Sequence, residues 1–453
     1  MFNKLFLGFI NVFSKLFSNF LLLKIISIYL GTSGIGIYSQ YRSFWQFSST
    51  ITTFNSGTFV IQRLSNSQNK SLFFLASFIS IFLFNIIFSI VILCNLEFLS
   101  LKIFLSTDIF FQNILIYSAF IIPLSSIILL ILNSLNGFKR FYLYTLFSFL
   151  IMLIYIFVSL FYAYFFINSF EQILKIILIS EILTIIMLII NFRYTLKKII
   201  LSKINFLLLK LEIIKFIKIS TFFLFSGSFF LISILLIKIF IIHEFGYSGL
   251  GLFESAWSLS LVISFITLRS LSFYYLPDLS SMTNINFNKL INNYFLISPI
   301  IILFLFVPVI IFNKYLIIFF FTSDFNSAFV YLRWLIVAEV VKLYGHLFAY
   351  PIISQSKYKF YLTLELLNTL FFLVLSFLSI TYLKNIELLT ISYLITNSLY
   401  VIVAFIYVSK VFKFKLVKNN IKILFLIIPF IIFISIINWN QEMYIFYNLL
   451  SIT

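Results

Sequence analysis

Polar side chains inside long apolar segments are the part of this sequence whose types and spacing could do chemistry. In one such segment Arg42, Gln46, Ser49, Thr53 and Ser56 follow one another at steps of four, three, four and three residues, which places them on one face of a helix. Lipid offers such groups no hydrogen bonds, so we expect this face to line a hydrophilic cavity. Helix-to-helix hydrogen bonding is an alternative for the hydroxyls, and it accounts less well for the guanidinium.

Basic residues in other apolar segments favour an anionic ligand. Only six of the 31 basic residues are Arg, although Arg forms bidentate contacts with phosphate that Lys cannot form. Half of these six, including Arg42 and Arg269, lie inside apolar segments rather than in the Lys-rich loops. The predicted substrate-binding residues are Lys15, Arg42, Gln46, Lys238 and Arg269.

Carboxylates within the apolar segments are candidate carriers of a coupling ion, and each is equally readable as a salt-bridge partner. We also expect Arg333, Glu339 and Lys342 to form a charge set on one helix, because Glu339 and Lys342 are three residues apart. No Walker motif or metal-binding constellation is present, so no cofactor and no metal are expected. The candidate ion-coupling residues are Glu244, Glu254, Glu339 and Glu365.

The elements that must position these residues are membrane-spanning helices. The chain is 62% hydrophobic and 10% charged, whereas soluble domains carry about 25% charged residues. Apolar segments long enough to cross ~30 Å of hydrocarbon recur along the whole length. We predict an all-α polytopic membrane protein with spans at 5–30, 37–62, 71–95, 112–135, 142–166, 172–192, 216–243, 252–276, 291–313, 327–350, 360–383 and 386–409, and a further C-terminal span at about 423–438.

The positive charge is distributed by topology. The net charge is +18, and Lys and Arg concentrate in every second loop, which places the N-terminus in the cytoplasm. The partner of this charge is therefore the anionic inner leaflet of the lipid bilayer, and no nucleic acid is expected. Residues 193–215 are basic with apolar residues at helical spacing, which predicts an amphipathic linker helix at the membrane interface.

An internal repeat organises the chain. Six of its 11 glycines fall in two matching octapeptides, GTSGIGIY from Gly31 and GYSGLGLF from Gly246. A second pair, KRFYLY from Lys139 and YKFYLT from Tyr358, recurs at nearly the same offset. The copies lie six spans apart, so the halves are parallel repeats. The predicted parts are an N-lobe at 1–192, the linker at 193–215, a C-lobe at 216–409, and a basic loop with the extra span at 410–453.

At these motifs the sequence resembles a known family. YLGTSGIGIYSQYRSFWQ, NGFKRFYLY and SQSKYKFYLTLELL are similar to segments of O-antigen flippases (Wzx-type) in the polysaccharide-transport branch of the MOP exporter superfamily, whose fold is MATE-like. The resemblance implies two six-helix lobes and alternating access. It also implies that undecaprenyl-diphosphate-linked oligosaccharide is moved from the inner to the outer leaflet of a bacterial cytoplasmic membrane. A polymerase and a chain-length regulator of the same pathway are implied partners.

Three alternatives stay open. A drug or cation exporter of the same superfamily would present an acidic cavity, whereas the candidate residues here are mostly basic. A lipid II flippase is similar in charge but normally has more spans. A membrane-embedded polysaccharide polymerase or acyltransferase would need a catalytic loop, and the predicted outer loops are all short. A transporter rather than an enzyme is therefore expected.

Overall fold

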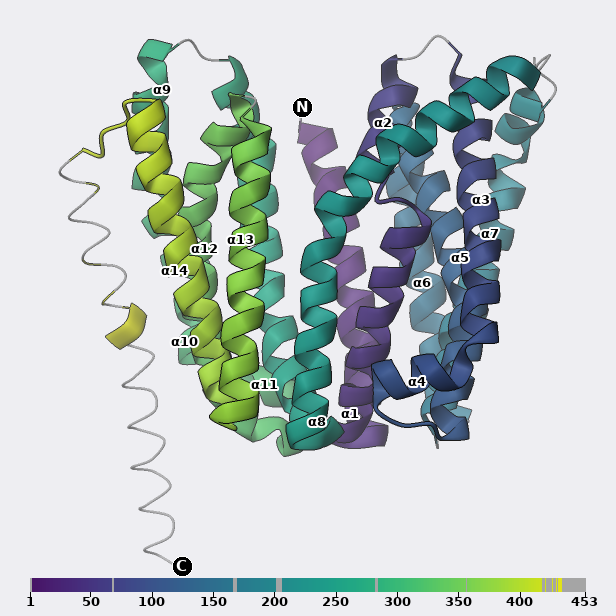
Figure 1. The fold of residues 1–453 in the computed structure, drawn as a ribbon, viewed down its shortest axis with the longest axis horizontal. Helices are drawn as coiled ribbons and strands as arrows, with labels where there is room; N and C mark the ends of the chain where they lie inside the picture. The colour runs from purple at the N-terminus through teal and green to yellow at the C-terminus, as the bar shows by residue number, and fades with distance from the viewer. Residues whose placement is uncertain are drawn as a thin grey trace, which may run out of the picture. The chain divides into compact units, whose positions relative to one another are not determined.

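A computed structural model describes residues 2–66, 69–165, 169–200, 206–281, 284–355 and 357–417, together with 420, 426, 429 and 431–433. Within these ranges every regular element is a helix (Figure 1). The α-helices are α1 (Phe2–Thr52), α2 (Gly57–Asn66), α3 (Lys70–Cys94), α4 (Leu96–Phe104), α5 (Ile109–Gly137), α6 (Phe141–Phe165), α7 (Phe170–Ile200), α8 (Phe206–Ser281), α9 (Asn284–Ile301), α10 (Val307–Ile311), α11 (Asn313–Phe320), α12 (Phe329–Ser354), α13 (Tyr358–Phe377) and α14 (Ile386–Val411). Short π or 3-10 turns occupy Ile302–Phe306, Ser323–Ala328 and Leu378–Tyr382.

Ten described helical stretches are long and apolar enough to cross a membrane. Two of them, Phe17–Ser65 with 49 residues and Gly227–Leu268 with 42, are too long for one crossing, because a helix rises about 1.5 Å per residue. Each contains one glycine with non-helical backbone angles: φ is 62° at Gly31 and 69° at Gly246. Each stretch therefore holds two spans, and the ten stretches supply the twelve predicted core spans. The protein is a multi-pass, all-helical membrane protein.

Both breaks occur at the first glycine of the repeated octapeptides. Their backbone conformations, with ψ of −155° at Gly31 and −176° at Gly246, belong to a region that only glycine occupies readily. In Figure 1 the chain of α1 runs to one end of its unit and then returns. The chain thus reverses at Gly31, between the predicted spans 5–30 and 37–62, and the backbone there requires a glycine.

The chain divides into two compact units, Met1–His243 and Glu244–Thr453. In the first unit α5 is the most enclosed span, because 61% of its apolar 18-residue stretch (its window) is buried. Four phenylalanines from different elements, Phe54, Phe59, Phe73 and Phe216, pack edge to face or tilted with ring centroids 5.6 to 6.3 Å apart. This aromatic cluster joins the start of α2 to α3 and α8 within the unit.

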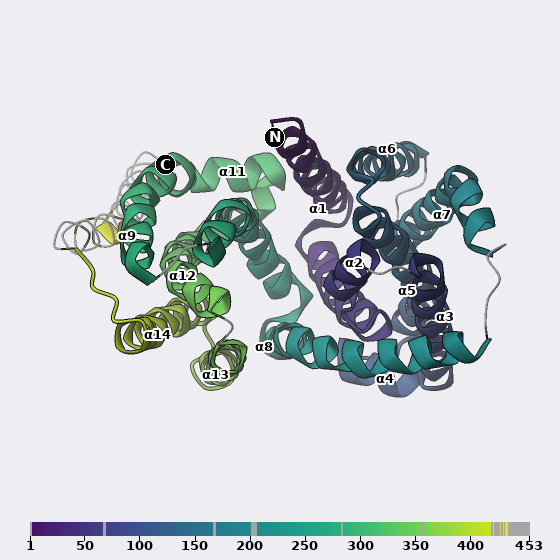
Figure 2. The same cartoon turned by 90° about the horizontal axis from the view of Figure 1, so that it is seen from above.

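In the second unit α12 takes the corresponding central place, with 83% of its window buried, and Figure 2 shows α9, α13 and α14 around it. The order of burial along the chain also repeats. The windows of α3, α5, α6 and α7 are 28%, 61%, 33% and 44% buried, and those of Phe287–Ile311, α12, α13 and α14 are 28%, 83%, 33% and 44% buried. The rank order of burial along the chain is thus the same in these two sets of four helices.

The linker and the C-terminal span are described only in part. α7 covers the predicted linker up to Ile200, α8 begins at Phe206, and residues 201–205 lie outside the described residues. The first turns of α8 expose Leu207 and Leu211 as well as Lys210, as an interfacial helix would. Most of the predicted span at about 423–438 lies outside the described residues, so it stays a prediction.

Candidate functional site

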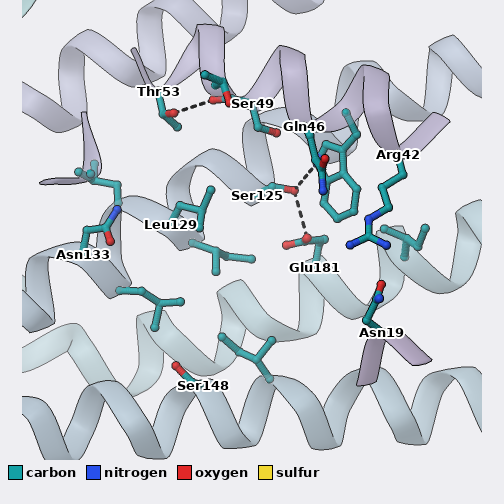
Figure 3. A pocket seen from close by; sticks show the side chains of 18 of the residues that line it. Asn19, Arg42, Gln46, Ser49, Thr53, Ser125, Leu129, Asn133, Ser148 and Glu181 are labelled. Atoms are coloured by element: carbon teal, nitrogen blue, oxygen red, sulfur yellow. Dashed lines mark hydrogen bonds between the residues drawn. The ribbon is translucent and has the colours of Figure 1, made fainter. Parts of the chain in front are cut away.

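The first unit contains a cavity of about 710 Å³, drawn in Figure 3. It is lined by α1, α2, α3, α5, α6, α7 and one residue of α8, Leu231. All members of the predicted polar stripe line it: Arg42, Gln46 and Ser49 from α1, and Thr53 and Ser56 from the connection to α2, where the predicted continuous helix is interrupted. The prediction from helical spacing that these residues face a polar cavity is therefore confirmed for all five. The cavity is formed entirely by residues of this one unit.

Arg42 is the most unusual residue of this surface. Its guanidinium points into the cavity in Figure 3, and it forms no hydrogen bond or ion pair with the residues that the structure describes. An Arg within a membrane helix is costly to insert and usually pairs with a partner or faces water. Because no described carboxylate neutralises Arg42, its five N–H donors remain available to a ligand that enters the cavity.

Glu181 on α7 supplies the opposite charge to the same cavity. Its Oε1 accepts hydrogen bonds from the Tyr155 hydroxyl at 2.7 Å and from Ser125 Oγ at 3.0 Å. Ser125 Oγ in turn accepts a bond from Trp45 Nε1 at 3.1 Å. This chain of contacts links α1, α5, α6 and α7 and holds the carboxylate in one orientation.

Sequence reasoning did not assign Glu181 to the site. The residue was visible as an isolated carboxylate within a predicted span, but helical spacing relates residues of one helix only. Ser125 and Tyr155, which bond to Glu181, lie 56 and 26 residues away from it along the chain. Only the packing of α5 and α6 against α7 brings these groups together.

Further polar and aromatic groups complete the wall. Asn19, Asn133 and Ser148 line the cavity from α1, α5 and α6, and Figure 3 shows Asn133 on the side away from Arg42. The indole of Trp45 also lines it and stacks on the buried Tyr41 ring, with centroids 6.1 Å apart and planes 25° apart. The cavity thus combines two charges, several amides and hydroxyls, and an aromatic face.

The other predicted substrate-binding residues differ in how far the structure describes them. Lys238 on α8 is buried, and its Nζ donates to the Ser39 carbonyl at 3.3 Å. It is not among the residues that line the cavity. The side chains of Lys15 and Arg269 lie outside the described part of the chain. The structure therefore brings together Arg42 and Gln46, while the roles assigned to Lys15, Lys238 and Arg269 stay predictions.

A second polar cluster lies in the second unit around Glu339 on α12. Its carboxylate lies 3.4 Å from Lys342 Nζ, which is the predicted pair on one helix, and accepts a bond from the Tyr393 hydroxyl at 2.9 Å. Lys342 Nζ also donates to the Tyr393 hydroxyl at 3.0 Å. These contacts close a buried triangle between α12 and α14.

Arg333 does not join this charge set. Its guanidinium binds Glu387 at the start of α14 at 2.6 Å, and Trp334 Nε1 donates to the same carboxylate at 2.8 Å. Arg333 lies nearly two turns from Glu339, and the facing helix offers a nearer carboxylate. The expectation of one charge set within α12 was wrong for Arg333 and right for Glu339 and Lys342.

The remaining candidate ion-coupling residues occupy different surroundings. Glu365 on α13 accepts a bond from the Tyr400 hydroxyl at 2.8 Å. Glu244 lies 3.7 Å from Lys384, whose side chain is 72% exposed. Glu254 is buried in the second half of α8. Among the residues that the structure describes, no three His, Cys, Asp or Glu side chains are grouped to hold a metal ion.

Comparisons with known proteins bear on the fold. No protein-family profile matches the chain, and no curated protein matches it in sequence. Solved structures do match. A multidrug-resistance MATE family transporter of the MOP superfamily in an inward-facing conformation aligns with a TM-score of 0.65 and 12% identity, over 89% of this chain and 94% of that one.

A MOP superfamily transporter from Pyrococcus furiosus, described as having a binding pocket of reversed polarity, aligns with a TM-score of 0.62 and 13% identity. That alignment covers 89% of this chain and 93% of the transporter. A MATE protein in complex with MaD3S aligns with a TM-score of 0.63 and 15% identity, over 89% and 94% of the two chains. The chain has the fold of the MATE-type transporters of the MOP superfamily.

Proposed function

We propose that this protein is a flippase. Its substrate is an undecaprenyl-diphosphate-linked oligosaccharide, such as an O-antigen repeat unit, which it carries from the inner to the outer leaflet by alternating access. The membrane is the bacterial cytoplasmic (inner) membrane, and the N-terminus lies in the cytoplasm. The transporter fold and the resemblance of the repeated motifs to flippases support this assignment. A polymerase and a chain-length regulator would act on the product.

The observation that carries the proposal is the guanidinium of Arg42, which lies in a polar cavity without a hydrogen-bond or ion-pair partner among the described residues. A diphosphate offers oxygens that match the bidentate donors of Arg, and the low dielectric of a membrane protein strengthens that contact. Gln46 and Ser49 extend the same polar surface along α1, and Thr53 continues it just beyond the helix end, where these groups suit the hydroxyl groups of sugars.

Export of surface saccharide tests the proposal. We expect Arg42→Ala to reduce export at least tenfold at equal protein level, and Arg42→Lys to restore only part of it, because Lys lacks the planar fork. Arg63→Ala is the matched control, since Arg63 pairs with Glu212 at 3.5 Å and does not line the cavity. Near-normal export by Arg42→Ala would contradict the proposal.

We also propose that carboxylates of the second unit couple transport to an ion. Glu339 and Glu365 are the stronger candidates because both accept hydrogen bonds from tyrosine hydroxyls on α14, while Glu244 and Glu254 remain in the proposal. Glu365→Gln, which cannot exchange a proton, is expected to abolish the response of transport to an imposed pH or sodium gradient in proteoliposomes. An unchanged response would remove Glu365 from the coupling site.

One observation favours a second candidate function. Glu181 places a carboxylate in the cavity, and carboxylates attract cationic drugs. Two of the similar structures are described as multidrug-resistance transporters. A drug or cation exporter would transport a cationic dye in proteoliposomes and would lose that transport in Glu181→Gln. The flippase proposal expects no dye transport.

A further inference from the structure

One oxygen of the Glu181 carboxylate has no hydrogen-bond partner in the part of the chain that the structure describes. Its Oε1 accepts the two bonds from Tyr155 and Ser125, and Oε2 receives none from the described residues. The residue is 5% exposed and lines the cavity into which Arg42 points. Because Oε2 is not fully enclosed, it is open to the cavity, and a ligand that donates a hydrogen bond to it would gain a contact with a charged acceptor.

The negative charge of Glu181 restricts which class of ligand the cavity favours. A carboxylate in the wall of a cavity repels an anion, and the repulsion is stronger in a medium of low dielectric than in water. If the ligand were only a phosphate, Glu181 would weaken its binding. The residue becomes favourable when the same ligand also carries hydroxyl groups, because a hydrogen bond to an ionised acceptor is among the stronger polar contacts.

The orientation of Glu181 is fixed before any ligand arrives. Tyr155 donates to Oε1 at 2.7 Å. The single Ser125 hydroxyl proton is within reach of both Oε1 at 3.0 Å and the Ile121 carbonyl at 2.9 Å, and Trp45 Nε1 donates to Ser125 Oγ at 3.1 Å. Trp45 is itself fixed, because one face of its indole packs on Tyr41. The acceptor and the aromatic ring thus belong to one rigid network, and such preorganisation lowers the entropy cost of binding.

The composition of the wall suits a sugar. Pyranose rings carry hydroxyls at their edges and C–H groups on their faces, and Trp45 offers an aromatic surface beside the polar groups. Asn19, Gln46 and Asn133 line the cavity and form no hydrogen bonds with the described residues. From Arg42 to Thr50 the wall follows α1 for about 12 Å, which is longer than a single hexose.

We propose that the cavity of the first unit is a saccharide subsite for a phosphosugar. Arg42 holds the phosphate, Glu181 Oε2 accepts a hydrogen bond from a hydroxyl of the attached sugar, and Trp45 packs against the sugar face. The phosphate contact rests on the proposed function. The reading of the sugar by Glu181 and Trp45 is the added step, and it gives the cavity a preference for a phosphorylated sugar over another organic phosphate.

Calorimetric titration of the full chain in lipid nanodiscs tests this preference with two soluble probes of similar charge. Glucose 1-phosphate carries the hydroxyls, and butyl phosphate lacks them. We expect the unchanged protein to bind glucose 1-phosphate about tenfold more tightly, which is the scale of one hydrogen bond to a charged group. In Glu181→Gln the preference falls to less than threefold, while butyl phosphate binds as well as before or better because a negative charge is gone.

Two further variants separate recognition from folding. Trp45→Leu is expected to lower the preference without changing the affinity for butyl phosphate. Ser118→Ala is the control, because Ser118 on α5 lies outside the cavity wall and its hydroxyl bonds to the Ile114 carbonyl of its own helix. Ser118→Ala should keep both affinities and the preference.

Each remaining outcome overturns a defined part of the argument. Equal affinity of the unchanged protein for both probes, or an undiminished preference in Glu181→Gln, would overturn the saccharide subsite and leave the phosphate contact of Arg42 standing. Failure of the unchanged protein to bind either probe would overturn the anion site as well, and with it the proposed function. Binding of a quaternary ammonium ion that is lost in Glu181→Gln would assign the carboxylate to a cation instead.

Discussion

The charged side chains inside this protein differ in their surroundings, and that difference determines how much stability is lost when a partner is removed. The side chain of Glu339 is 0% exposed, and its carboxylate pairs with Lys342 and accepts a hydrogen bond from Tyr393. Glu244 instead pairs with a lysine whose side chain is 72% exposed. Helical spacing predicted the Glu339–Lys342 pair and the part of the stripe from Arg42 to Ser49, because these relations lie within one helix. Thr53 and Ser56 line the cavity from the connection between α1 and α2. Helical spacing did not predict the Arg333–Glu387 pair or the Glu181 network, because these depend on which helix packs on which.

At Glu339 we predict a large loss of stability on removing one partner. Lys342→Met leaves a buried carboxylate without its counter-charge, which costs about 3–5 kcal/mol. The double variant Lys342→Met with Glu339→Gln removes both charges and should recover most of that loss. Thermal unfolding in detergent measures the effect. Lys384→Met, which leaves the more accessible Glu244, should change stability by less than about 1 kcal/mol. Equal effects of the two lysine variants would contradict this reading.

Helix ends and crossings are set at the scale of the element. The octapeptides marked the turns in the sequence, and the positive φ of Gly31 and Gly246 explains why glycine stands at the first position of each. The sequence did not predict that α1 and α2 are separated by two non-glycine residues with positive φ, Phe54 at 54° and Asn55 at 47°. That strain is compensated by tertiary contacts, which no local pattern reveals.

Substitution of the turn glycines tests backbone strain alone, because the added side chain meets no steric clash. A Cβ at Gly31 or Gly246 would meet no atom within 4 Å, so the cost of Gly31→Ala and Gly246→Ala is the torsional strain alone, about 1–3 kcal/mol each. Ser33→Ala in the same turn is the control and should change stability little. Thermal unfolding of the three variants is the measurement. An unchanged melting temperature in both glycine variants would show that the turns adopt another conformation.

The contact between Asn55 and α8 gives a second prediction at this scale. Asn55 Nδ2 donates to the Phe223 carbonyl at 3.1 Å, and a Cβ at Gly227 would overlap the Asn55 amide. Gly227→Ala should therefore destabilise the protein by about 1–3 kcal/mol. Adding Asn55→Gly removes the amide and relieves a positive φ, so the double variant should regain stability. A double variant less stable than Gly227→Ala alone would be the contrary result.

The whole molecule is where sequence and structure agree most. Segment hydropathy predicted twelve core spans, and the octapeptides predicted a duplication that reappears in the matching order of burial in the two units. The span count follows from the apolar segments that the lipid requires, and the duplication follows from the repeated motifs, so both can be recognised in the sequence itself. The cavity of the first unit was predicted only as a polar face of one helix, because the other walls come from five further helices and one residue of α8.

Orientation in the membrane is a prediction for the whole molecule. Cys94 is the only cysteine, so Cys94→Ser gives a cysteine-free background. Asp324 and Lys357 are exposed and lie beyond opposite ends of α12. The charge distribution predicts that Asp324→Cys reacts with a membrane-impermeant maleimide in intact cells, and that Lys357→Cys reacts only after the inner membrane is opened. The reverse pattern would invert the topology and the direction of transport.

The hairpin of α1 has a consequence for how the protein is made. A translocon that receives the second half of α1 alone meets Arg42, and one Arg at the centre of a helix opposes insertion by about 2.5–3.5 kcal/mol. The first half has just entered the bilayer and is joined to the second by a reversal at Gly31. We therefore expect the two halves to insert as a pair, with the turn at Gly31 keeping the helix that carries Arg42 next to the helix already in the bilayer.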